Sequence, residues 1–145
     1  MLIDKIIHKG EILSIIIHAG YLNPGVHFFT PDEFSQQLGY MNHPAGTRIQ
    51  PHVHLPVPRK LTYTQEVLFI KKGKLRVDFY GSDQEYVESR ILKTGDVILL
   101  ASAGHGFQVL DDLEMFEVKQ GPYSEGGDKA RFEGIEPGDA LVKEG

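Results

Sequence analysis

The sequence predicts an all-β fold with at most one or two short helical turns. Its apolar residues occur in short runs broken by Gly, Pro, Asn and Asp, and no window of about twelve or more residues has helical periodicity. The chain has 145 residues, of which 16 are Gly and 8 are Pro, as expected for a turn-rich domain. A domain of about 150 residues buries enough surface to fold without disulfides, and cysteine is absent. We therefore expect one β-sandwich or barrel over residues 1–145.

The first third of the chain is expected to contain four strands and one turn of helix. Lys9-Gly10 and Asn23-Pro24-Gly25 supply turns between the apolar runs. Thr30, followed by Pro31 and by Glu33 three residues on, matches a capping box and predicts the helical turn. The expected strands cover residues 2–8, 11–18, 26–29 and 36–41.

The second half of the chain has clearer alternation. Residues 66–71 and 74–80 flank Lys72-Gly73 and predict a hairpin, whose second strand has one polar, solvated face. Tight turns are expected at Gly104-His105-Gly106 and at Asp111-Asp112. The further strands expected here cover residues 97–102, 107–110 and 113–120, and residues 121–145 are expected to form a tail that packs on the surface or is partly mobile.

Charge and hydropathy exclude several classes of function. The chain has 15 Lys and Arg against 20 Asp and Glu, a net charge of −5 that gives no general attraction for nucleic acid or anionic lipid. The longest apolar runs are too short to span a membrane, and the N-terminus lacks the features of a signal peptide. We therefore expect a cytoplasmic protein that binds neither nucleic acid nor membrane. Nucleophilic cysteine is excluded, and no Gly-x-Ser-x-Gly elbow is present.

Only one pair among the seven histidines has a spacing with mechanical meaning. His52 and His54 would point to the same face of a strand, about 6–7 Å apart, and could converge on one cation. Arg48 and Gln50 share that face, which suits the wall of a site better than an apolar core. The alternative is a pair of solvent-facing histidines.

The surroundings of this pair resemble the first motif of the cupin superfamily, Gly-x5-His-x-His-x(3,4)-Glu-x6-Gly. Gly46 precedes His52 by five intervening residues, and six residues separate Glu66 from Gly73. The segment from Gly95 to His105 resembles part of the second cupin motif. The chain departs from the family in three places. Eleven residues, 55–65, separate His54 from Glu66. In the second motif, Ala101 and Ala103 occupy the proline and glycine positions, and alignment of His105 requires a one-residue deletion. Val109 occupies the asparagine position of that motif. The resemblance, closest to small single-domain bacterial cupins, implies a double-stranded β-helix, which is a jelly-roll barrel.

The cupin resemblance also implies a metal site in the mouth of that barrel. The implied ligands of one divalent transition metal, Fe, Mn, Ni, Co or Zn, are His52, His54, Glu66 and His105. Glu66 has the parity of Leu68 and Ile70, so it would lie on the apolar inner face, where a metal would compensate its charge. The alternatives are a solvated Glu66 and a His105 that serves only in a turn.

Polar side chains near these positions are candidates for substrate binding, although each could also be an ordinary surface residue. They are Arg48, Gln50, Arg59, Tyr63 and Gln108. His8, His18 and His27 are expected to be structural.

Three functions follow from this set. The first is a metal-dependent enzyme, of oxygenase or isomerase type, that acts on a small sugar, keto acid or phenol with Glu66 as catalytic base. The second is a metal-free sugar-nucleotide isomerase or epimerase in which His52 or His54 works with Tyr63. The third is a non-catalytic module that binds a small ligand. The Ile-rich N-terminal strands also predict a homodimer.

Overall fold

The computed structural model describes residues 2–125 and 127–144 and confirms that the fold is nearly all-β. The described residues form eight strands and one short 3-10 helix. The elements are β1 Ile3–His8, β2 Glu11–Ile17, β3 Gly25–Phe28, β4 Gly39–Asn42, β5 Glu66–Tyr80, β6 Tyr86–Lys93, β7 Val97–Leu100, β8 Gly104–Lys119 and η1 Pro137–Asp139.

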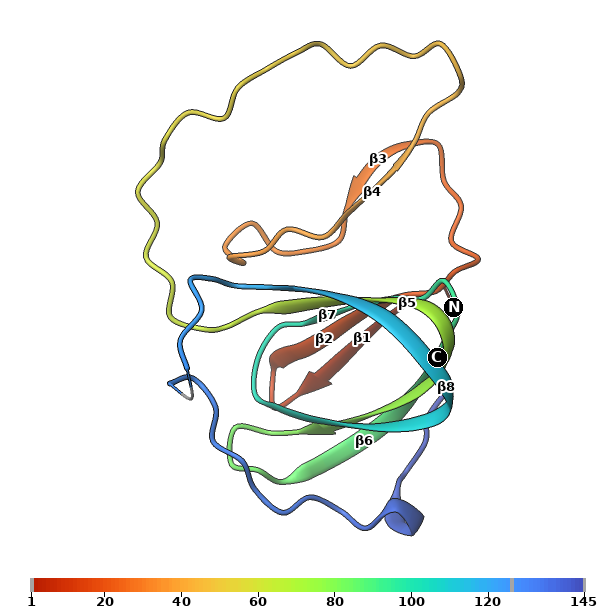
Figure 1. Cartoon of the computed structure of the whole chain (residues 1–145), viewed down its shortest axis with the longest axis vertical. Helices are drawn as coiled ribbons and strands as arrows, with labels where there is room; N and C mark the ends of the chain where they lie inside the picture. The colour runs from red at the N-terminus through yellow and green to blue at the C-terminus, as the bar shows by residue number, and fades with distance from the viewer. Residues whose placement is uncertain (1, 126, 145) are drawn as a thin grey trace.

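The main sheet is antiparallel and is organised around the long strand β5. Its order is β1-β2-β7-β5-β6, with β8 paired to β5. Residues 66–69 of β5 pair with β7 and residues 74–80 pair with β6, while β8 follows the other edge of β5. The β5–β8 ribbon curls, so that the sheet becomes a half-barrel (Figure 1).

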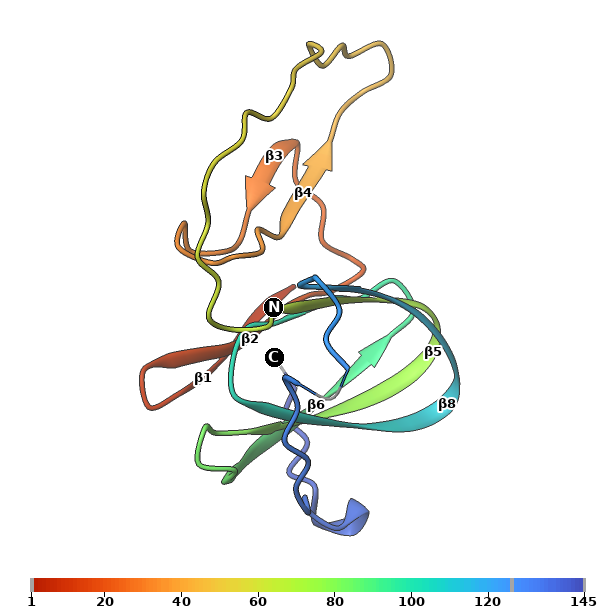
Figure 2. The ribbon, with the colours of Figure 1, turned by 60° about the vertical axis from the view of Figure 1, so that its left-hand side comes forward.

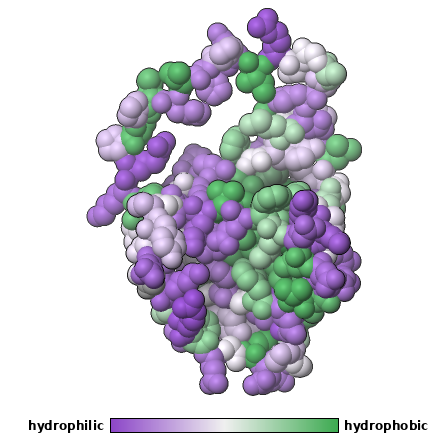
Figure 3. Space-filling view, in the orientation of Figure 1, coloured by the Kyte–Doolittle hydropathy of each residue, from purple (hydrophilic) through white to green (hydrophobic). Residues whose placement is uncertain are grey.

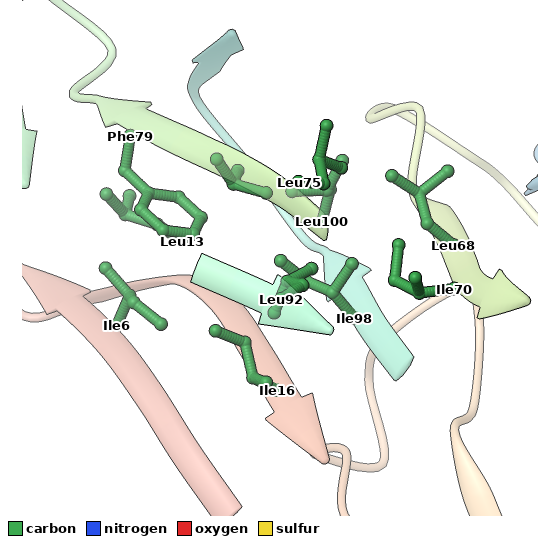
Figure 4. Packing of buried hydrophobic residues seen from close by; sticks show 11 residues of the cluster. Ile6, Leu13, Ile16, Leu68, Ile70, Leu75, Phe79, Leu92, Ile98 and Leu100 are labelled. Carbon is green, nitrogen blue, oxygen red and sulfur yellow. The ribbon is translucent and has the colours of Figure 1, made fainter. Parts of the chain in front are cut away.

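The inside of the half-barrel is the hydrophobic core (Figure 4). Because side chains alternate along a strand, β5 contributes every second residue to this face until its register shifts. The buried core residues are Ile6, Leu13, Ile16, Leu68, Ile70, Leu75, Val77, Phe79, Leu92, Ile98 and Leu100. Burying each such large side chain stabilises the fold by about 1.5–3 kcal/mol. A smaller cluster, built on Ile15, Ile17 and Leu99, lies on the outer face of β2 and β7.

The predicted hairpin at Lys72-Gly73 is wrong, because β5 runs without interruption through these residues. Gly73 has a φ of 102°, and a Cβ there would lie 2.1 Å from the carbonyl oxygen of Asp112. The register between β5 and β8 shifts around this contact, which marks a β-bulge rather than a turn. The turn predicted at Asp111-Asp112 is also wrong, since these residues belong to the continuous strand β8.

Two other local predictions need correction. The corner predicted at Gly104-His105-Gly106 lies inside β8, and the chain turns just before it, where Ala103 has a φ of 64°. The Thr30 capping box does not form: its hydroxyl donates to Gln37 Oε1 at 2.7 Å and accepts from the Leu38 amide at 3.3 Å. No helix follows, since only the Phe34 amide closes a turn on Pro31.

The face of β5 that was expected to be solvated is covered by the C-terminal tail. Arg76 and Asp78 are buried, and Arg76 donates two hydrogen bonds to Asp78 and one to the carbonyl of Pro137. The Phe132 ring packs on Tyr80 with 5.0 Å between centroids, and the Tyr80 hydroxyl accepts from the Ile135 amide at 3.0 Å. The alternating polar residues of β5 therefore lie on a face that is buried, where the C-terminal tail supplies some of their polar contacts.

The segment between β4 and β5, residues 43–64, is here called the arm. All of its residues are exposed, and it contains no helix or strand. It arches away from the half-barrel beyond the separate two-stranded sheet of β3 and β4 (Figures 1 and 2). The strand expected to carry His52 and His54 is therefore absent. Prolines at four arm positions remove backbone donors, which weakens strand pairing.

Candidate functional site

Glu66 and His105 meet on the inner face of the half-barrel. Glu66 begins β5 on the same face as Leu68 and Ile70, as its parity predicts. His105 lies near the start of β8, opposite Phe79 of the core. The curl of the β5–β8 ribbon brings Glu66 Oε2 to 3.9 Å from His105 Nε2, with side chains that are 13% and 27% exposed.

Burial makes the charged form of each of these two groups unfavourable. Desolvation raises the pKa of the Glu66 carboxyl, and the nearby charge of Glu117 raises it further. Desolvation lowers the pKa of the His105 imidazole. A carboxyl that retains its proton to higher pH therefore faces an imidazole that stays neutral to lower pH.

A cavity of about 420 Å³ gives access to this pair from the side of the arm's base. His105 lines the cavity, whereas Glu66 does not and lies 3.9 Å from the His105 ring nitrogen. The other lining residues are Thr62, Tyr63, Thr64, Leu100, Ser102, Ala103, Gly127 and Asp128. Four of them carry hydroxyl groups. Thr64 donates its hydroxyl hydrogen to Asp128 and Ser102 donates its own to the Ile12 carbonyl, so these two offer acceptors to a polar ligand, and Thr62 and Tyr63 also offer donors.

A buried amide fixes the position of this site relative to the strands. The side-chain oxygen of Gln65 accepts from the Ser35 hydroxyl at 3.2 Å and from the Gln36 amide at 3.0 Å. The Gln65 carbonyl accepts from the Gln120 amide at 3.1 Å. The first two bonds tie the residue before β5 to residues 35–36, and the third ties it to the residue after β8, so the backbone next to Glu66 is held from two sides.

Of the remaining predicted site residues, only Tyr63 shares the cavity with His105. His52 and His54 lie in the exposed arm, where their ring centroids are 5.2 Å apart and His52 Nδ1 contacts the carbonyl of Gln50 at 3.0 Å. The arm also carries Arg48, Gln50 and Arg59, all exposed. Tyr63 lines the cavity, but Gln108 pairs with Arg76 and so faces the opposite side of β8 from His105.

The four implied metal ligands are therefore not gathered within one chain. Among the described residues, no group of three or more His, Cys, Asp or Glu side chains lies close enough to hold a metal ion. The structure brings together Glu66 and His105 and leaves His52 and His54 together elsewhere. The two pairs are apart because the arm does not form the strand that would place His52 and His54 in the half-barrel.

Sequence reasoning missed a second cluster of charged residues at the seam between β1 and β6. Arg90 Nε donates to Glu88 at 2.7 Å, and His18 Nε2 lies 2.6 Å from Asp4 Oδ2. Asp96 Oδ2 approaches the other ring nitrogen of His18 at 3.8 Å. The signal was available, because Asp4 alternates with Ile6, and Glu88 and Arg90 with Leu92, on core-facing positions. Asp4, His18, Arg90 and Asp96 of this cluster line a cavity of about 590 Å³.

Comparisons with protein-family models, with curated proteins and with solved structures find no match to this chain. Among the described residues, no helix has the length and apolar character needed to cross a membrane.

Proposed function

We propose that this chain is a cupin-type enzyme in which His105 moves a proton to or from a small molecule held in the 420 Å³ cavity. The observation that supports it most directly is the pairing of His105 with Glu66 at 3.9 Å on a largely apolar inner face. The curled antiparallel ribbon of β5 and β8 supports a jelly-roll arrangement, because it turns residues that are distant in the sequence toward one interior.

The proposed chemistry is proton transfer next to a carbonyl group. His105 lines the cavity and, being neutral, can take a proton from a C–H bond of the ligand, whose electron pair passes into the enolate. Glu66, once ionised, stabilises the resulting imidazolium across 3.9 Å. Return of a proton to the same carbon from the opposite face gives the epimer, and return to the neighbouring carbon, with transfer of the hydroxyl proton between the two oxygens of the enediol, gives the isomer, so that no oxidant or reductant is consumed. Glu66 is then a positioning residue, and His105 is the catalytic one.

The walls of the cavity favour a hydroxylated ligand. Thr62, Tyr63, Thr64 and Ser102 line the same cavity as His105, and a volume of about 420 Å³ lies within the range of small-molecule pockets. Arginine does not line it, which argues against a strongly anionic group beside His105. Sugars and hydroxy-keto compounds fit this wall best.

Metal binding by His52, His54, Glu66 and His105 stays a prediction. The residues of a single chain do not fit such a centre, because the arm holds the first two away from the last two. No step of the proposed proton transfer passes through a metal. Elemental analysis of protein purified without chelators tests the prediction directly: one transition-metal ion per chain supports it, and its absence after growth with added metals contradicts it.

The experiment that tests the proposed function is solvent deuterium exchange followed by proton NMR. The purified protein is incubated in D₂O with aldoses, ketoses, keto acids and nucleotide sugars, and loss of the signal from the carbon-bound proton is measured. We expect exchange in at least one class, a loss of about 100-fold or more in His105→Gln, and a smaller loss in Glu66→Gln.

Glu114→Gln is the matched control, since Glu114 is an exposed carboxylate on the same strand as His105. It should exchange at the wild-type rate. Undiminished exchange in His105→Gln would overturn the assignment. Binding without exchange, seen as a ligand-dependent rise in Tm, would instead support the non-catalytic module.

A further inference from the structure

Strand β8 has one edge that is not paired with another strand among the described residues. It pairs with β5 along its 16 residues, and no described strand pairs with its other edge. Phe107 and Val109 face the interior beside this edge and remain 42% and 57% exposed. A long edge with free backbone groups and exposed apolar side chains is a strong template for an added strand.

The arm also has unpaired backbone groups and exposed apolar side chains. Among the described residues, no backbone–backbone hydrogen bond involves residues 48–64. The apolar side chains Ile49, Val53, Leu55 and Val57 are between 57% and 80% exposed. In the space-filling view the arm stands clear of the body, with apolar residues interspersed among polar ones (Figure 3). A solvated loop has no physical need for these aliphatic side chains.

The charges of the arm and of β8 also complement each other. The arm has three basic residues, Arg48, Arg59 and Lys60, and no Asp or Glu, which gives +3 without histidine. Strand β8 has four acidic residues and one Lys, which gives 1 − 4 = −3. The acidic residues are Asp111, Asp112, Glu114 and Glu117. Opposite charges of this size on two unpaired segments favour their association.

The arm is held away from the β8 of its own chain. Tyr21 packs edge-on against Phe29 and Tyr40, with centroids 5.3 and 4.8 Å away, which fixes the direction of the β3–β4 hairpin. Phe29, Phe34 and Leu38 join the cluster on the outer face of β2 and β7. At its other end the arm is anchored by the buried Gln65. Both ends therefore direct the arm outward, as Figure 2 shows.

We propose that two copies of this chain exchange arms, so that the arm of each copy adds a strand to the free edge of β8 in the other. Such an exchange is two-fold symmetric and closes after two copies. It pairs the free backbone groups of both segments, covers Phe107 and Val109, and places the basic arm on the acidic strand. His105 lies on this same strand, so the exchanged arm carries His52 and His54 toward it; this last point alone rests on the proposed function.

The first test is photo-crosslinking with isotope-labelled chains. A photoreactive p-benzoylphenylalanine replaces Val53, whose side chain is 80% exposed. ¹⁴N and ¹⁵N chains are unfolded, mixed and refolded together, irradiated and digested, and the crosslinked peptides are identified by mass spectrometry. We expect crosslinks from position 53 to residues 104–119, with about half of them joining a ¹⁴N to a ¹⁵N peptide. Crosslinks to β8 only within one isotope, or none to β8, would overturn the exchange.

The second test measures mass by sedimentation. The wild type should be a dimer at micromolar concentration, and the double variant Val53→Asp/Leu55→Asp should shift to the monomer, because carboxylates would face the acidic strand. Tyr123→Asp, at a residue 82% exposed outside the arm, should remain a dimer. A monomeric wild type, or a dimer unaffected by the arm variant, contradicts the proposal. Both measurements are independent of turnover, so an exchanged dimer without proton exchange would refute only the proposed chemistry.

Discussion

Arg90 Nη1 in β6 lies 3.4 Å from Asp4 Oδ2 in β1, so a charged pair joins the two outer strands of the curled sheet. Both side chains are largely buried, at 14% and 8% exposure, and Arg90 also contacts Glu88. Replacing Arg90 by Met leaves the buried carboxylates of Asp4 and Glu88 without their guanidinium partner.

We therefore expect Arg90→Met to lower the free energy of unfolding by about 3–5 kcal/mol in urea titrations. Lys9→Met is the control, because Lys9 makes only exposed pairs, with Asp83 at 3.4 Å and Glu85 at 3.8 Å, and its replacement should have little effect. Equal stability of the two variants would show that the seam does not depend on this ion cluster.

The raised pKa of Glu66 predicts how stability depends on pH. Folding disfavours the ionised carboxyl, so the wild type loses stability as pH rises from the ordinary value of 4.5 through the raised pKa of the folded state. Glu66→Gln cannot ionise and avoids that loss. The difference in unfolding free energy between the variant and the wild type should therefore increase in favour of the variant between about pH 4 and pH 8. A pH-independent difference would contradict the desolvation argument.

The bulge in β5 predicts a position that accepts only glycine. Gly73→Ala combines a positive φ with a Cβ placed 2.1 Å from the Asp112 carbonyl oxygen, so the β5–β8 ribbon must shift. We expect a loss of more than about 2 kcal/mol in chemical unfolding. Gly10→Ala has a similar φ of 78° but meets nothing within 4 Å, and it should cost only about 1–2 kcal/mol. The reverse order would mean that the close approach to Asp112 is easily relieved.

The Tyr80 hydroxyl predicts how the C-terminal tail is held. It accepts a hydrogen bond from the Ile135 amide, and Tyr80→Phe removes that acceptor while retaining the ring that packs on Phe132. Amide hydrogen exchange of residues 131–143 should become faster, and the unfolding free energy should fall by about 1 kcal/mol. Tyr63→Phe, at an exposed residue far along the chain, should leave exchange of the tail unchanged. Unaltered exchange in Tyr80→Phe would assign the anchoring to the ring alone.

The face on which a strand residue lies could be predicted from the sequence, because successive side chains point to opposite faces and the apolar ones mark the buried face. This alternation placed Glu66 with Leu68 and Ile70 on the inner face, and the structure agrees. Turn chemistry was less decisive, since Gly73 serves a bulge just as well as a hairpin. The His-x-His spacing could not predict where His52 and His54 lie. It assumes a strand, a strand must pair with a neighbouring strand, and the arm pairs with none among the described residues.

The burial of Arg76 and Asp78 also shows that a local sequence pattern cannot predict contacts with a distant segment of the chain. Their alternation with Leu75 and Val77 indicated a solvated face, but the group that covers it is the C-terminal tail, whose Pro137 lies 61 residues after Arg76. No local pattern carries that information.

Strand β5 is hydrogen-bonded to three other strands along its 15 residues, to β7 near its start, to β6 near its end and to β8 on its far edge. None of the three strands that flank β5 can detach from it without breaking one of these ladders. Unfolding should therefore be cooperative, with the central amides of β5 the last to exchange with solvent in the native state. We therefore expect the strands around β5 to unfold as one cooperative unit, which is lost when β5 loses its hydrogen bonds.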